Sequence, residues 1–460
     1  MSFDSFLSII GLNEFIALDL ETSGLDSNKN KIIELSAYKF VNGKPTKSFT
    51  HLIDPKIKVN KIITKITGIT NDMLTGQKTF DQIENDFKTF IGDMPVIGHN
   101  ILFDLSFLSK NIGNYKSLFR SRSVCDTFYL SKIYYYYANS FSLSSLCDLK
   151  KITVSESHRA EQDAKNSGLL FLSILKDLMQ YSDKSLIQKF VNCIKSYDVP
   201  NKNLFQNILK YYESEPTIIK KNDKLYKHPY FYIDYKSTSQ SKPEYSIEDV
   251  FKEDGIIDKS LDGYETRNNQ INFCADIYKT LISDSSLIAD AGAGLGKSYA
   301  YIFASLLYLS KTKKQIIIST NTHTLQNQLF YKDIPFALEV LDKDCKVAII
   351  KGMNNYICLS RFYDLLENVD IFLNNSEVLE ILPIIMWLEN TSSGDISECN
   401  GFNIRYYNYI WSMINSRSDY CTTFRCNLYN GCYYKKIRDL SSSSDILIVN
   451  HSMLVSYYDK

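Results

Sequence analysis

The feature that most constrains the fold is a short apolar run near the amino end that finishes in two carboxylates. Residues 15–20 read as a buried strand, with Asp19 and Glu21 two residues apart at its carboxyl end. In a strand, residues i and i+2 face the same side of the sheet, so both carboxylates share one side. Burying two like charges is costly unless a cation neutralises them, and the alternative is a strand end that reaches solvent.

The first 180 residues continue as strands and helices joined by short loops, which is an α/β pattern. Asn42-Gly43 marks a hairpin turn between two strands. The predicted strands are 31–40, 48–53 and 95–99, and the predicted closing helix is 167–179.

More carboxylates follow on separate elements of this zone. Asp104 falls in the first turns of a helix after the strand at 95–99, and Asp163 falls on a later helix with His158 five residues before it. Four converging carboxylates suit Mg²⁺ or Mn²⁺, and two such ions can stabilise the attacking and leaving oxygens of a phosphodiester. A histidine, with its pKa of about 6.5, is suited to activating the attacking water.

Segments 15–24, 98–108 and 158–164, in this order, resemble the motifs of DnaQ-like 3′–5′ exonucleases of the DEDDh type. The resemblance implies an RNase H-like fold and metal-dependent removal of 3′-terminal nucleotides as 5′-monophosphates. By position it implies His158 as the base and, as metal ligands, Asp19, Glu21, Asp104 and Asp163. The nearby acids Glu161 and Asp126 are expected to serve structure.

Beyond this zone the pattern changes twice. Residues 181–260 are rich in Lys, Asn, Ser and Tyr and are predicted to be a helical connector and tether. From residue 261 to 460 a second parallel α/β pattern begins, with a strand at 316–320. It is interrupted from about 358 to 440 and resumes with a strand at 445–449.

A glycine-rich loop lies early in the second pattern. It follows the short apolar segment Leu287–Ala289, a predicted strand, and precedes a helix. Such glycines let backbone N–H groups approach phosphates, the lysine reaches the terminal phosphates, and the serine can hold Mg²⁺. The predicted ATP-binding residues of the loop are Gly292, Gly294, Gly296, Lys297 and Ser298.

The neighbours of this loop resemble helicases of superfamily two. Residues 264–270 resemble an adenine-contacting motif that ends in Gln270, whose amide can pair with the adenine edge. Residues 321–329 resemble a DNA-contacting motif of the same proteins. For Gln270 alone, a surface amide is the simpler reading.

Five of the ten cysteines lie after residue 357. Four thiolates suit iron–sulfur or zinc, but structural zinc sites usually show tighter pairs. The spacing resembles the iron–sulfur insertion of DinG-like and XPD-like helicases, and Cys399 ranks below the other four. The resemblance implies a 4Fe–4S cluster on Cys358, Cys421, Cys426 and Cys432. Structural cysteines are the alternative, and the aromatics around them could stack on single-stranded bases or pack the small domain.

The helicase pattern is incomplete in this sequence. DinG-like proteins carry an Asp-Glu-Ala-His box, but no Asp-Glu dipeptide occurs in the chain, and no second RecA-like half follows. The resemblance therefore implies a DnaQ–DinG fusion with a partial P-loop (RecA-like) domain. We expect negligible ATP hydrolysis and no unwinding by this polypeptide alone.

Composition excludes some classes and leaves several functions open. Lys+Arg and Asp+Glu are both 52, so bulk charge does not indicate nucleic acid, and the cysteine usage favours a reduced, cytoplasmic protein. The apolar runs are too short for a membrane span. The leading hypothesis is a 3′–5′ exonuclease acting on DNA with a free, single-stranded 3′ end. The alternatives are a helicase component completed by a separate chain, an RNA exonuclease and a proofreading subunit.

Overall fold

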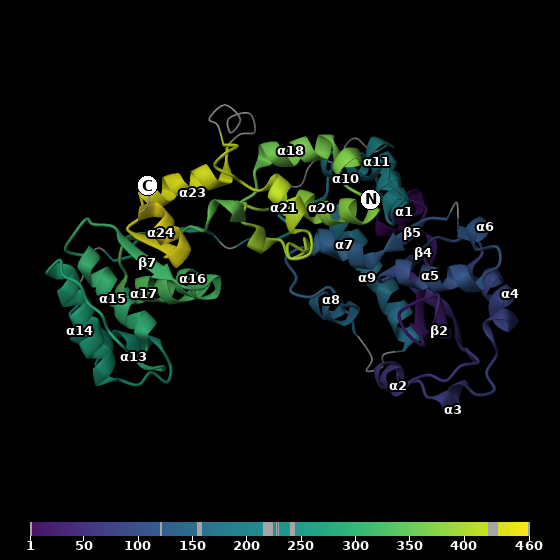
Figure 1. The fold of residues 1–460 in the computed structure, drawn as a ribbon, viewed down its shortest axis with the longest axis horizontal. Coiled ribbons are helices and arrows are strands. Elements are labelled where there is room, and N and C mark those ends of the chain that lie inside the picture. The colour runs from purple at the N-terminus through teal and green to yellow at the C-terminus, as the bar shows by residue number, and fades with distance from the viewer. Residues whose placement is uncertain are drawn as a thin grey trace. The chain divides into compact units, whose positions relative to one another are not determined.

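The protein is described by a computed structural model, whose contacts divide the chain into two compact units (Figure 1). The structure describes residues 2–119, 122–153, 159–214, 224–226, 228, 230–239, 244–421 and 431–458. The first unit comprises Met1–Lys227, Asp364–Thr391 and Ser397–Trp411, and it is here called the nuclease unit because it contains the segments that resemble exonuclease motifs. The second, here called the phosphate-loop unit, comprises His228–Tyr363, Ser392–Ile396 and Ser412–Lys460.

The nuclease unit is built on a five-stranded sheet of order β3-β2-β1-β4-β5. Strands β1, β2 and β3 are antiparallel, whereas β4 and β5 run parallel to β1. The β2–β3 hairpin turns at Asn42 and Gly43, both left-handed with φ of 50° and 73°, as predicted. The strands are β1 (Glu14–Thr22), β2 (Ile32–Val41), β3 (Lys44–Leu52), β4 (Val96–Gly98) and β5 (Val124–Asp126).

The helices of this unit cover the sheet and extend beyond it. The predicted helix at 167–179 is confirmed. It is part of a longer helix that begins at Ala160 and also carries Asp163. The helices are α1 (Phe3–Ile9), α2 (Lys61–Thr67), α3 (Asn71–Leu74), α4 (Phe80–Ile91), α5 (Ile101–Asn111), α6 (Tyr115–Phe119), α7 (Thr127–Tyr134), α8 (Leu143–Leu149), α9 (Ala160–Tyr181), α10 (Lys184–Ile194), α11 (Lys202–Ser214), α19 (Val369–Phe372), α20 (Asn375–Leu388), the short η3 (Ile396–Glu398) and α21 (Asn408–Ile414).

Strand β1 sends alternate side chains to opposite faces of the sheet. Ile16, Leu18 and Leu20 join the apolar cluster that includes α4 and α5. Phe15 lies on the other face, where its ring meets Phe171 of α9 edge to face at 5.6 Å. Odd-numbered residues of β1 therefore face α9, which packs along β1 and β2.

Close packing of α9 on the sheet depends on Gly168. A Cβ at this position would lie 2.3 Å from the ring of Phe40 and 3.1 Å from the Cβ of Ala17. Since a larger side chain would push the helix away, Gly168 fixes how near the first turns of α9 come to β1.

The segment Asp364–Thr391 adds α20 to the nuclease unit. Its helix starts with a capping box, in which Asn374 accepts from the Glu377 N–H and Glu377 accepts from the Asn374 N–H. The helix is apolar on most sides, and it packs against α7 and α10. A helix that is apolar all round must be buried, which accounts for its place in this unit.

The phosphate-loop unit is built on a four-stranded sheet of order β6-β8-β9-β7. Strands β7, β8 and β9 are parallel, and β6 is antiparallel to β8. The strand predicted at 316–320 is confirmed, and the one predicted at 445–449 is shifted by one residue. The strands are β6 (Tyr232–Tyr235), β7 (Ile316–Thr320), β8 (Cys345–Ile349) and β9 (Ile446–Asn450).

The helices of this unit enclose a second apolar core, formed by α12 to α17 and the strands. None of the described helices in either unit has the length and apolar character needed to cross a membrane. The helices are α12 (Ile247–Phe251), α13 (Ile256–Ser260), α14 (Asn268–Ile282), α15 (Lys297–Leu309), α16 (His323–Gln328), a π-helical turn η1 (Leu329–Asp333), α17 (Ile334–Leu341), the short η2 (Met353–Asn355), α18 (Leu359–Glu367), α23 (Tyr433–Ser442) and α24 (His451–Tyr458).

The prediction of a strand at Leu287–Ala289 is wrong for this structure. These residues have no regular secondary structure, and Ile288 is 100 % exposed. A strand needs a neighbour to satisfy its backbone N–H and C=O groups, and no described strand pairs with this segment. Predicting a strand from an apolar run alone therefore presupposes a neighbouring strand that the sequence does not identify.

Candidate active site

Strand β1 places two predicted ligands on the face that α9 covers. Asp19 and Glu21 continue the alternation of Phe15 and Ala17, so both carboxylates lie on this side of the sheet. On the neighbouring strand β2, Glu34 pairs directly with Glu21 and lies on the same face. The sheet register therefore gathers three acidic side chains at one end of β1.

Helix α9 adds a further carboxylate to this face. Asp163 lies in its first turn, and the carboxylate oxygens of Asp19, Glu21 and Asp163 lie within 4.8 Å of one another. Three of the four predicted ligands are thus brought together from a strand and a helix. Such a set of oxygens is suited to a hard divalent cation.

The fourth predicted ligand, Asp104, lies on α5 and is bound to β1. Its Oδ1 accepts a hydrogen bond from the Leu20 N–H at 2.9 Å, and the residue is 3 % exposed. Its charge is, after burial, the main cause of the raised pKa of Asp19. Asp104 is therefore close to the other acids, although its carboxylate does not belong to the group of three whose oxygens lie within 4.8 Å of one another.

Burial and mutual repulsion make these carboxylates unusually basic. Burial, followed by the charges of Asp104 and Asp163, raises the pKa of Asp19 well above its usual range. Burial, followed by the charges of Asp163 and Glu34, raises the pKa of Glu21 to about 7. Acids that repel one another and lack a full set of counter-charges favour a bound cation, so the residues fit Mg²⁺ or Mn²⁺.

An ion pair fixes the start of α9 beside these acids. Glu34 is completely buried and accepts from Arg159 Nε at 3.1 Å and from the Ala160 N–H at 3.2 Å. Arg159 also lowers the pKa of Glu21, partly offsetting the carboxylates around it. The pair was missed from the sequence, although a lone Glu between the apolar residues of a buried strand signals that a counter-charge is required.

Not all predicted residues of this site can be placed. His158, the predicted base, lies outside the described residues. Another histidine of this unit, His99, is half-buried, and this burial lowers its pKa to about 4. Its Nε2–H donates to the Phe141 carbonyl at 2.9 Å, so neutral His99 serves structure.

The predicted phosphate loop lies exposed ahead of α15. Gly294 and Gly296 have φ of 82° and 79°, a backbone conformation that glycine adopts without strain. The Lys297 ammonium donates to the carbonyls of Ala291 and Gly292 at 2.8 and 3.0 Å. Ser298 Oγ accepts from Tyr301 Oη at 3.4 Å. The lysine therefore lies inside the curve of the loop.

Gln270 lies behind the loop and is 3 % exposed. Its Nε2 donates to the Gly296 carbonyl at 2.9 Å, and its Oε1 accepts from Tyr264 Oη at 3.3 Å. Both ends of the amide thus support the loop in this structure. Contact between Gln270 and an adenine stays a prediction.

Two of the predicted cluster cysteines, Cys421 and Cys432, lie close enough to Cys358 in the phosphate-loop unit to affect its pKa. Burial raises the pKa of Cys358, and the thiols of Cys421 and Cys432 raise it further. The fourth, Cys426, lies outside the described residues. Cys399 is buried in the nuclease unit, which agrees with its lower rank.

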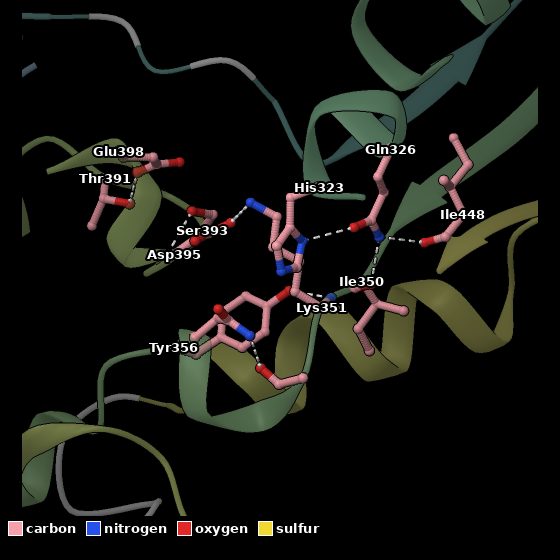
Figure 2. Close-up of polar contacts among 12 residues, drawn as sticks. His323, Gln326, Ile350, Lys351, Tyr356, Thr391, Ser393, Asp395, Glu398 and Ile448 are labelled. Atoms are coloured by element: carbon pink, nitrogen blue, oxygen red, sulfur yellow. Dashed lines mark hydrogen bonds and ion pairs between the residues drawn. The ribbon is translucent and has the colours of Figure 1, made fainter. Parts of the chain in front are cut away.

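A polar network that the sequence did not reveal joins the end of β8 to the middle of β9 (Figure 2). The buried Gln326 Nε2 donates to the carbonyls of Ile350 and Ile448 at 2.8 and 3.2 Å. Lys351, 6 % exposed, forms an ion pair with Asp395 at 2.5 Å. Asp395 belongs to the five-residue segment Ser392–Ile396, which this network ties to the sheet of the phosphate-loop unit.

Comparison with protein families supports the assignment of the nuclease unit. Residues 16–171 match the family model described as Exonuclease, RNase_T. The chain is also similar to the "3'-5' exonuclease DinG" of Bacillus subtilis, with 26% identity over 464 residues, covering 96% of this chain and 47% of the relative. The protein of the same name from Staphylococcus aureus is 27% identical over 453 residues, covering 97% and 48%.

The chain spans about half the length of the curated relatives it matches. Among solved structures, Exonuclease X in complex with 5' overhanging duplex DNA has a TM-score of 0.28 and 21% identity, covering 35% of this chain and 90% of that chain. Exonuclease I has a TM-score of 0.34 and 15% identity, covering 39% and 46%. These scores are low, so the assignment depends on residues 16–171 and on the sequence relatives.

Proposed function

Because residues 16–171 form an exonuclease domain and the chain is homologous over nearly its whole length to bacterial proteins named 3′-5′ exonuclease DinG, we propose that it removes nucleotides from the 3′ end of DNA. The observation that carries the proposal is the cluster of Asp19, Glu21 and Asp163 oxygens within 4.8 Å. Buried carboxylates with raised pKa values are a costly arrangement that a divalent cation relieves.

In this proposal each element of the nuclease unit has a separate task. Strand β1 and helix α9 hold three ligand oxygens, and α5 supplies Asp104 against the Leu20 N–H. Two bound Mg²⁺ or Mn²⁺ ions would supply charge stabilisation for the attacking and leaving oxygens of the phosphodiester. His158 is proposed as the base on the strength of the motif resemblance.

The test is release of nucleotides from a 3′-labelled single strand with Mg²⁺ or Mn²⁺. Asp19→Asn and Asp163→Asn preserve shape but remove ligand charge, and each is expected to reduce the rate by at least about 100-fold. Glu161→Gln is the matched control, since Glu161 is exposed in the same first turn of α9. Activity that survives both ligand substitutions at the wild-type rate refutes the proposal. Parallel DNA and RNA strands decide the sugar preference.

For the phosphate-loop unit we propose ATP binding. Support comes from the left-handed Gly294 and Gly296 and from the Lys297 ammonium inside the loop. Labelled ATP is expected to bind, and Lys297→Ala is expected to abolish binding. ATP binding that survives Lys297→Ala at the wild-type affinity would contradict the proposal.

We further propose that Cys358, Cys421, Cys426 and Cys432 hold a 4Fe–4S cluster. The effect of the Cys421 and Cys432 thiols on the pKa of Cys358 supports the proposal. Anaerobic reconstitution followed by iron analysis and visible absorption is the test. Cys358→Ser is expected to abolish the absorption, whereas Cys399→Ser, in the nuclease unit, is expected to preserve it.

A further inference from the structure

Asn201 lies beyond the residues that match the exonuclease family, yet it is bound to the edge of the nuclease sheet. It is 1 % exposed and left-handed, with φ of 67°, and directly precedes α11. Its backbone N–H donates to the Val124 carbonyl at 2.9 Å. Its side chain accepts from the Asp126 N–H at 2.9 Å and donates to the Asp126 carbonyl at 3.1 Å. Because β5 is an edge strand, Asn201 satisfies backbone groups that a further strand would otherwise bind.

Asp126, which Asn201 fixes, holds the turn that starts α5. Its Oδ1 accepts from the Asn100 N–H at 3.0 Å and from the Phe128 N–H at 2.9 Å, and the residue is completely buried. Asn100 is left-handed, with φ of 62°, and directly precedes α5. Non-glycine residues rarely adopt this conformation unless the surroundings hold them there. The Asp126 carboxylate therefore sets the direction in which α5 leaves β4.

The direction of α5 determines where Asp104 lies. Asp104 is in the first turn of α5 and is bound to the Leu20 N–H, between the two predicted ligands of β1. A continuous path thus runs from Asn201 through Asp126 and Asn100 to Asp104.

We propose that Asn201 is a positioning residue for the nuclease reaction, acting through Asp126 on the placement of Asp104. The inference rests on the proposed function, because it assigns Asp104 to the metal-binding set. It also places α11 within the functional nuclease unit, beyond residues 16–171.

The test variant is Asn201→Gly, because glycine keeps the left-handed backbone and removes both side-chain hydrogen bonds to Asp126. The matched control is Asn42→Gly, which makes the same chemical change at an exposed left-handed turn of the same unit. Nucleotide release is measured against Mn²⁺ concentration and against strand concentration. Partners that orient ligands typically contribute about 10–100-fold in metal affinity or activity.

We expect Asn201→Gly to raise the half-saturating Mn²⁺ concentration about tenfold, at the lower end of that range because Asn201 acts at a distance. The KM for the nucleic-acid strand is expected to change less than about twofold, since Asn201 is buried and its side chain is bound to Asp126. A second variant, Asn201→Asp, keeps an acceptor for the Asp126 N–H but loses the donor, and it is expected to shift the Mn²⁺ dependence in the same direction. The control is expected to match wild type.

Calorimetry with Mn²⁺ separates this inference from the proposed function. A wild-type chain that binds Mn²⁺ but releases no nucleotide overturns the proposed function, whereas weaker Mn²⁺ binding by the variants supports the positioning role. Folding is checked by tryptophan fluorescence. If either folded variant binds Mn²⁺ as tightly as wild type, or if only its thermal stability falls, the inference is overturned.

Discussion

The ion pair between Lys132 of α7 and Glu380 of α20 tests how firmly the segment Asp364–Thr391 is built into the nuclease unit. Lys132 Nζ and Glu380 Oε1 are in direct hydrogen-bond contact, and the two residues are 6 % and 5 % exposed. Glu380 Oε2 has no hydrogen-bond partner among the described residues. Each charge therefore depends mainly on the other for its compensation.

The expected magnitude follows from this mutual dependence. Removing one partner of a buried pair leaves an uncompensated charge, at a cost of about 3–5 kcal/mol, whereas replacing both partners with apolar residues is often neutral. We expect Lys132→Met and Glu380→Met each to lower the free energy of unfolding by about 3–5 kcal/mol. The double variant is expected to recover most of this loss, because no buried charge is left alone.

Tryptophan fluorescence during urea unfolding is a selective assay for this effect. The only two tryptophans of the sequence, Trp387 and Trp411, are buried in the nuclease unit, so they report on that unit. Lys189→Met is the matched control, because Lys189 pairs with Glu389 of the same segment at 2.6 Å but their side chains are 37 % and 28 % exposed. Its cost is expected to stay below about 1 kcal/mol. Single variants at the buried pair that cost no more than this control, or a double variant whose loss equals the sum of the two, would refute the reasoning.

Three further predictions concern the carboxylate cluster and its supports. Because the folded pKa of Glu21 is about 7 against 4.5 for the free side chain, its protonated form stabilises the metal-free fold, and this stability is lost as pH rises from about 4.5 through 7. Thermal unfolding should therefore show a larger stabilisation by Mn²⁺ at pH 8 than at pH 6, and a pH-independent Mn²⁺ effect contradicts this. Glu34→Gln removes the charge that Arg159 requires, and urea unfolding should show a loss of about 1.5–3 kcal/mol. Gly168→Ala forces α9 from the ring of Phe40, so the loss is expected to be about 1–3 kcal/mol with reduced nuclease activity, and an unchanged stability would show that the helix shifts freely.

The common face of Asp19 and Glu21 could be predicted from the sequence because its signal is local and periodic. The two-residue spacing of Asp19 and Glu21 fixed their common face, and the register with β2 and the approach of α9 then produced the cluster. The sequence placed Asp163 on a helix, but it did not show that this helix and the one predicted at 167–179 are a single helix, α9.

Contacts between distant segments were beyond local patterns. The apolar run of α20 indicates burial, but nothing in it specifies α7 and α10 as its partners. Likewise, Leu287–Ala289 has the composition of a strand, but whether it forms one depends on a partner strand that composition does not identify. Asn201 shows the same limit, since an amide in a connecting segment carries no sequence signal for the strand that it binds.

The polar residues around the acidic cluster counteract the repulsion among its carboxylates. Asp19 and Glu21 repel each other and the acids beside them, which disfavours the arrangement in the absence of a cation. The surrounding fold resists this repulsion through fixed contacts: Glu34 with Arg159 at the start of α9, and Asp104 with the Leu20 N–H on β1. Strain at a functional site persists only where neighbouring structure over-determines it. The buried ion pair and hydrogen bonds therefore keep the carboxylates together, because without them the carboxylates could move apart and become exposed to solvent.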